Sequence, residues 1–137
     1  MCLYLNFLGI LFAIHKKLMY LCVMYSSELI KGTLKTIVLN LLKDNDKMYG
    51  YEITQKVKDL TAQKIQITEG ALYPTLHALE KHGDVTTEKV YIGKRVRKYY
   101  RLTDQGINTA NERVNELSDF MNTMRFLLDL DSKTSNA

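Results

Sequence analysis

Residues 84–103 have the sequence DVTTEKVYIGKRVRKYYRLT, and this stretch gives the strongest indication of the fold in the chain. Two runs rich in Val, Thr, Tyr and Ile flank Gly93, which is the pattern of a β-hairpin with a tight turn. The stretch holds six cations and two anions, a local net charge of +4 that equals the formal charge of the whole 137-residue chain. A basic hairpin tip can reach a phosphate backbone, although similar charges also protect the edges of solvated hairpins.

Three helices are predicted before this hairpin. Apolar residues recur at helical spacing over residues 27–43 and again from Tyr49 to about residue 61. A third helix begins after Thr68, a favourable N-cap, and ends at Gly83, a favourable C-terminal stop. Between the second and third helices, the alternation in Ile65–Ile67 predicts a short strand that pairs with the hairpin.

A long helix is predicted after the hairpin, over residues 104–131, with Thr103 as its cap. Its net charge is −4, so it contrasts with the basic hairpin. Apolar residues alternate at spacings of three and four, which is a heptad seam over three repeats. We predict that this seam forms a dimer through Ile107, Val114, Leu117, Met121, Met124 and Leu128, with Ala110 between the first two.

The order of elements predicts a mainly α-helical fold with a small β-wing, namely a winged helix-turn-helix with a long C-terminal dimerisation helix. Residues 24–103 form the predicted DNA-binding domain, residues 104–131 the dimerisation helix and residues 132–137 a disordered tail.

Residues 1–23 form an apolar extension that differs from the rest of the chain and holds both cysteines. Its apolar runs are too short to span a bilayer, and its charges follow the first run instead of preceding it as in a signal peptide. Three interpretations stay open: translated upstream sequence absent from a mature protein that starts at Met24 or Met19, an apolar helix on a partner subunit, or a membrane anchor. We favour the first, and so expect no membrane association of the mature protein.

In a winged helix-turn-helix the third helix enters the major groove, whose width of about 12 Å admits a helix. Its outward residues are predicted to meet bases and phosphates, and they are Thr68, Glu69, Tyr73, Thr75 and His77. The wing is predicted to contact the flanking backbone or minor groove through Lys94, Arg95, Arg97 and Lys98. The alternatives are that Tyr73 is partly buried against the helix-turn angle and that His77 is simply solvated.

Three segments closely resemble the PadR family of bacterial transcriptional regulators. They are MYGYE at Met48–Glu52, ITEGALYPTLHALEKHG at Ile67–Gly83 and RKYYRLTDQG at Arg97–Gly106. The resemblance implies a homodimeric repressor that binds a palindromic operator, dimerises through its C-terminal helix and, in some members, is released by a small aromatic inducer. With no tryptophan, the chain lacks the tryptophan-sandwich drug site of some short members.

The sequence therefore predicts a cytoplasmic, DNA-binding transcriptional regulator that works as a homodimer on double-stranded operator DNA. We expect no cofactor, no metal site and no enzymatic activity, because no phosphate loop, ligand cluster or nucleophile–base pair is present in the sequence. The alternative is a winged-helix protein–protein module that no longer reads DNA. Its weakness is the basic wing, for which such a module has no use.

Overall fold

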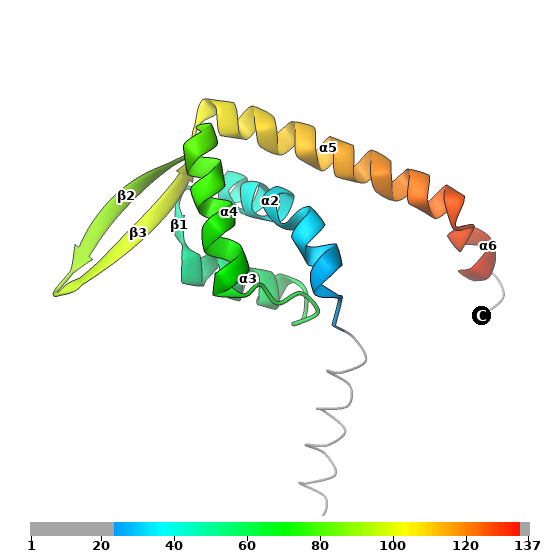
Figure 1. Cartoon of the computed structure of the whole chain (residues 1–137), viewed down its shortest axis with the longest axis horizontal. Helices are drawn as coiled ribbons and strands as arrows, with labels where there is room; N and C mark the ends of the chain where they lie inside the picture. Colours follow the sequence, from blue (N-terminus) through cyan, green and yellow to red (C-terminus); the bar gives the residue numbers. More distant parts are fainter. Residues whose placement is uncertain (1–23, 135–137) are drawn as a thin grey trace, which may run out of the picture.

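Figure 1 shows a group of short helices in the centre, a hairpin projecting to one side and a long helix projecting to the other. This computed structural model describes residues 24–134, so the predictions for residues 1–23 and 135–137 lie outside the described residues. The elements in chain order are α2 (Ser27–Asp44), β1 (Met48–Tyr49), α3 (Gly50–Leu60), α4 (Glu69–His82), β2 (Val85–Ile92), β3 (Arg95–Leu102), α5 (Asp104–Leu127) and α6 (Leu130–Thr134). This layout confirms the predicted winged helix-turn-helix with a long C-terminal helix.

The core lies between α2, α3, α4 and the base of the hairpin. Each helix contributes buried apolar side chains, although Leu60, which we predicted on the buried face of α3, is exposed; the largest fully buried side chains are Val38, Leu39, Ile53, Leu72 and Leu76. Burying a side chain of this size stabilises the fold by about 1.5–3 kcal/mol before entropy is counted. The core therefore fixes α4 on the helices behind it and leaves its opposite face free.

Both predicted ends of α4 are confirmed. The Thr68 hydroxyl accepts a hydrogen bond from the Ala71 amide at 3.3 Å. Gly83 adopts a left-handed conformation with φ of +89°, and the next amide, that of Asp84, donates to the Leu79 carbonyl at 3.0 Å. The helix continues through Pro74. These caps satisfy the terminal backbone groups that a helix leaves unpaired.

The hairpin of β2 and β3, called the wing below, is confirmed with its turn at Gly93, whose φ is +61°. The third strand of the sheet, however, is not the one predicted. Met48 and Tyr49 form β1 and pair with Tyr100 and Tyr99 of β3, whereas Ile65–Ile67 forms no strand. The Ile65 amide donates instead to the Thr61 hydroxyl at 3.1 Å, so the apolar alternation there reflects loop packing.

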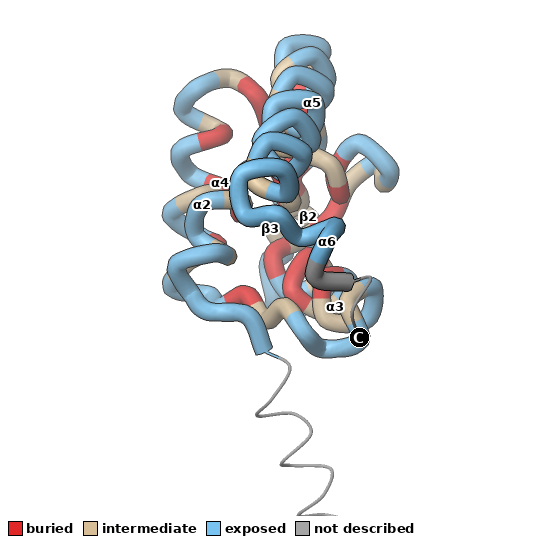
Figure 2. The backbone as a smooth tube through the Cα atoms, turned by 90° about the vertical axis from the view of Figure 1, so that its right-hand side faces the viewer, coloured by how far each residue is buried: buried red, intermediate tan, exposed pale blue. Residues whose placement is uncertain are grey.

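Helix α5 begins as predicted, with the Thr103 hydroxyl accepting a hydrogen bond from the Gly106 amide at 3.0 Å. The predicted end at Asp131 is wrong, because Asp129 has a φ of +51°, which breaks the helix after Leu127. Helix α6 then extends into residues 132–134, which we predicted to be disordered. Figure 2 shows that α5 is exposed along most of its length. Within residues 24–134 no helix combines the length and apolar character needed to cross a membrane.

Candidate nucleic-acid interface

The free face of α4 begins at its N-terminus, where Thr68, Glu69 and Gly70 are all exposed. A Cβ added at Gly70 would meet nothing within 4 Å, so the first turn of the helix is open to a ligand. The N-terminal end of a helix carries partial positive charge and outward N–H groups, which suit a phosphate oxygen. Two predicted contact residues, Thr68 and Glu69, therefore lie exposed at this end of the helix.

Tyr73 and His77 continue this free face, four residues apart and both exposed. Tyr73 is 46% exposed, and one side of its ring lies on α3. A Cβ added at Gly50 would come within 2.8 Å of the Tyr73 hydroxyl oxygen, so a larger residue there would make the end of the ring shift. The structure thus combines the two interpretations of Tyr73. The side chain is partly buried between α3 and α4, and it is still exposed enough to contact a ligand.

Thr75 is less exposed than Tyr73 and His77, the residues of this face that flank it. Its side chain is half-buried, and its hydroxyl donates a hydrogen bond to the Ala71 carbonyl of the same helix at 3.0 Å. A threonine whose proton is given to its own backbone offers a ligand only the lone pairs of its oxygen. The structure thus brings Thr68, Glu69, Tyr73 and His77 together on one free face and leaves Thr75 at its border.

The strand register separates the four predicted cations of the wing. Successive side chains of a strand point to opposite faces, so Arg95 and Arg97 share one face of β3 while Lys98 lies on the other. Lys94 lies in the turn and is exposed. Within residues 24–134 neither Lys94, Arg95 nor Arg97 takes part in an ion pair. These three cations remain available to a polyanion.

Lys98 is used inside the protein instead. Its ammonium lies 2.9 Å from a carboxylate oxygen of Glu80 on α4, and the other oxygen of Glu80 accepts a hydrogen bond from Thr87 of β2 at 3.0 Å. Lys98, and then Thr87, hold the pKa of Glu80 below its ordinary value. In turn Glu80 raises the pKa of Lys98. This pair joins the wing to α4.

The opposite face of the wing carries a layer of cations and tyrosines that the sequence analysis missed. The Arg97 guanidinium lies 4.6 Å from the centre of the Tyr49 ring, and the Lys47 ammonium lies 5.2 Å from that of Tyr99. The Tyr49 and Tyr99 rings meet edge to face at 5.4 Å. A hydrogen bond with Tyr99, followed by the influence of Tyr49, raises the pKa of Arg97.

This arrangement orients Arg97 by stacking, and no ion pair within residues 24–134 involves its guanidinium. The signal that could have revealed part of it is the alternation of Lys47 and Tyr49, which is typical of a strand, although we placed the start of a helix at Tyr49.

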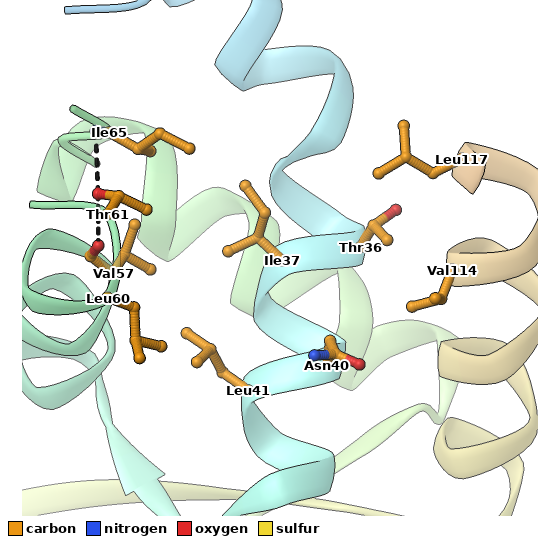
Figure 3. Close-up of a pocket in the computed structure, with 10 residues that line it drawn as sticks. All are labelled: Thr36, Ile37, Asn40, Leu41, Val57, Leu60, Thr61, Ile65, Val114 and Leu117. Atoms are coloured by element: carbon orange, nitrogen blue, oxygen red, sulfur yellow. Dashed lines mark hydrogen bonds between the residues drawn. The ribbon is translucent and has the colours of Figure 1, made fainter. Parts of the chain in front are cut away.

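An open hollow of about 310 Å³ lies behind this surface, between α2, α3 and α5. Figure 3 shows Ile37 and Leu41 of α2 facing Val57 and Leu60 of α3. On its other side α2 presents Thr36 and Asn40 toward α5, where Val114 and Leu117 complete the lining. The hollow is almost wholly apolar, and two residues of the predicted heptad seam belong to it.

The six predicted seam residues differ in their exposure. Ile107, Val114, Met121 and Leu128 are exposed, whereas Leu117 and Met124 are half-buried. Ala110, within the same seam, is fully buried. Beyond the seam the same helix exposes further large apolar side chains, Phe120, Phe126 and Leu127. The C-terminal half of α5 is therefore an apolar surface that nothing in the described chain covers.

A capped helix with a free face, set beside a basic two-stranded wing, defines the winged helix-turn-helix class. The family model of the transcriptional regulator PadR-like family matches residues 38–112. The chain belongs to this family of transcriptional regulators, as its sequence motifs predicted. The prediction that it is not an enzyme is likewise confirmed, because the family consists of regulators.

Relatives and solved structures agree with this assignment. Uncharacterized protein X of Lysinibacillus sphaericus is 38% identical over 103 residues, which are 70% of this chain and 88% of that protein. A transcriptional regulator from Clostridium thermocellum, Cth-833, has a similar structure, with a TM-score of 0.68, 30% identity and coverage of 72% of this chain and 96% of that one. Bacillus subtilis PadR in complex with operator DNA is also similar, with a TM-score of 0.54, 29% identity and coverage of 59% and 46%.

Proposed function

We propose that the chain is a homodimeric repressor that binds a palindromic DNA operator with α4 in the major groove and the wing on the flanking backbone. The observation that carries this proposal is the free face of α4 beside three wing cations that take part in no ion pair within residues 24–134. The similarity to a PadR that binds operator DNA supports it. Because its target is the chromosome, the proposed regulator works in the cytoplasm.

Within this proposal the two surfaces have different roles. The free face of α4, with Glu69, Tyr73 and His77, meets base edges and nearby phosphates, whereas Arg95 and Arg97 contact the backbone or a narrow minor groove. Contacts to phosphate supply affinity without sequence choice, and contacts to bases supply the choice. The prediction that Lys98 contacts DNA stays untested, and its pairing with Glu80 favours a role in holding the wing.

The exposed apolar surface of α5 supports the homodimer. A helix with apolar residues at heptad spacing buries them against an equivalent helix, and a second copy of the chain supplies one. Two copies related by a two-fold axis then present two α4 helices, which accounts for a palindromic operator with half-sites one helical turn or a multiple of it apart.

Binding assays over a range of salt concentrations test the role of the wing. The double variant Arg95→Ala with Arg97→Ala should weaken binding to all DNA sequences about equally and reduce the salt slope by about 2. Lys35→Ala, which removes an exposed cation from α2, serves as the control and should leave both unchanged. A wing variant that binds with the original affinity and salt slope would refute the assigned role.

His77→Ala tests the reading role of α4. It should change which bases are preferred while leaving the salt slope intact. A preference unchanged by His77→Ala but altered by the wing variant would show that the roles are reversed. If the unsubstituted chain binds DNA only weakly, and salt does not change that affinity, the alternative of a protein–protein module is favoured.

A small aromatic inducer is part of the same proposal. The hollow between α2, α3 and α5 is apolar and has a volume at the lower end of the range for small-molecule pockets, about 300–1,000 Å³. A compound bound there would contact α5 and the helices behind α4 at once. Release of operator DNA by such a compound from the unsubstituted chain, but not from Ile37→Trp, would support this site. Equal release from both would place the inducer elsewhere.

A further inference from the structure

The C-terminal end of α4, the base of the wing and the N-terminal end of α5 meet at one corner of the molecule (Figure 1). Asp84 lies at this corner, between the cap of α4 and the first residue of β2, and is only 2% exposed. It is the single buried charged residue in the described part of the chain. Burying a carboxylate costs free energy unless hydrogen-bond donors surround it. The elements that supply these donors are therefore the ones that the carboxylate holds together.

The donors to this carboxylate come from the two helices that meet there. The Thr109 hydroxyl of α5 donates to Oδ1 at 2.8 Å, and the Gln105 amide of the same helix lies 3.4 Å from that oxygen. Nδ1 of His82, the last residue of α4, lies 2.9 Å from Oδ2. The Thr109 proton can also reach the Gln105 carbonyl at 3.0 Å, but a carboxylate is the stronger acceptor.

The backbone of Asp84 joins the same two helices. Its amide donates to the Leu79 carbonyl of α4, and its carbonyl accepts from the Thr103 amide, both at 3.0 Å. The Gln105 side chain also donates to the His82 carbonyl at 2.9 Å. The corner is therefore a joint in which one buried residue is bonded to α4 on one side and to the start of α5 on the other.

We propose that Asp84 is a positioning residue for operator binding, which fixes the angle between α4 and α5 and so the distance between the two α4 helices of a dimer. This inference rests on the proposed function, because that distance matters only for a dimer on DNA. Helix α4 has 14 residues and is about 21 Å long. A rotation of about 10° at the joint would move its far end by about 3.5 Å, close to one base-pair step of about 3.4 Å.

A loosened joint should thus change which half-site separations are accepted and leave the preferred bases alone. The test uses the full chain and a set of operators whose half-sites are moved together or apart by one or two base pairs. Affinity is measured for each operator with the unsubstituted chain, Asp84→Asn and Thr109→Val. The controls are Thr109→Ser, which keeps the hydroxyl, and Glu112→Gln, which neutralises an exposed carboxylate on α5.

The unsubstituted chain and both controls should lose about tenfold or more in affinity for each base pair of displacement. Asp84→Asn and Thr109→Val should flatten this profile to about threefold or less, or move its optimum. If the two variants lose affinity by the same factor at every separation, the shape of the profile is unchanged. Asp84 then only stabilises the fold, and the inference is overturned.

The remaining outcomes are also decisive. If Asp84→Asn does not fold, Thr109→Val decides, because it removes one donor and keeps the carboxylate. An unsubstituted chain that binds no operator refutes the proposed function itself. A sharp profile that neither variant alters refutes this inference alone.

Discussion

Gly106 lies in the first turn of α5, and replacing it with alanine tests how closely this helix packs on the base of the wing. A Cβ at this position would lie 1.9 Å from the Asp84 carbonyl oxygen, whereas contacts under 3.0 Å are essentially never seen. The backbone must therefore move by about 1 Å, the difference between these two distances. The Asp84 carbonyl cannot move freely, because it accepts a hydrogen bond from the Thr103 amide at 3.0 Å, and the Thr103 hydroxyl is itself held by the Gly83 carbonyl at 2.6 Å.

The cost follows from these contacts. Overpacking costs about 1–3 kcal/mol and one weakened hydrogen bond about 1 kcal/mol, while alanine regains up to about 1 kcal/mol of helix propensity. We expect Gly106→Ala to lower the free energy of unfolding by about 2 kcal/mol and the Tm by about 5–10 °C.

The assay is thermal and urea unfolding at one fixed protomer concentration, because association shifts apparent stability. Gly32→Ala is the matched control, since it lies inside α2 and a Cβ there would meet nothing within 4 Å. It should leave stability unchanged or raise it by up to about 1 kcal/mol. If Gly106→Ala is as stable as Gly32→Ala, this result would contradict the close packing of the Gly106 backbone on the Asp84 carbonyl.

Two further predictions concern the wing and the seam. Because Lys98 lowers the pKa of Glu80 in the folded chain, the carboxylate stabilises the fold above its ordinary pKa of 4.5, and this contribution is lost as the pH falls through the lowered value. Urea unfolding between about pH 5 and pH 3 should therefore show a steeper loss for the unsubstituted chain than for Glu80→Gln, and equal slopes would contradict the pairing. Met121→Asp, which puts a charge in the seam, should weaken the dimer by about tenfold or more in sedimentation experiments, whereas Asn122→Asp on the same helix should not. If both variants dimerise equally, the seam is not the interface.

Local patterns predicted most of the fold. The ends of α4 at Thr68 and Gly83 depend on side chains and dihedral angles within one turn, which the sequence displays directly. The wing follows from two strand-forming runs around Gly93, and the start of α5 from its cap at Thr103. Each of these signals lies within the element that it defines.

Apart from the end of α5, the errors concern pairings between distant segments. Whether Met48–Tyr49 or Ile65–Ile67 pairs with β3 depends on how the helices pack, because each candidate strand is only two or three residues long. The partner of Lys98 could not be found from charge counts either. Glu80 lies 18 residues earlier in the chain, and the two meet only because the strand register turns Lys98 toward α4. Arg97, its neighbour in sequence, faces the tyrosines instead.

The central claim is that two copies of the chain place two α4 helices on adjacent turns of one duplex. Selection of random duplexes by the purified chain, followed by sequencing, tests it most directly. We expect enrichment of a two-fold symmetric site whose half-sites lie about 10 base pairs apart or a multiple of that. Enrichment of a single unsymmetric site, or of no site, would contradict the claim.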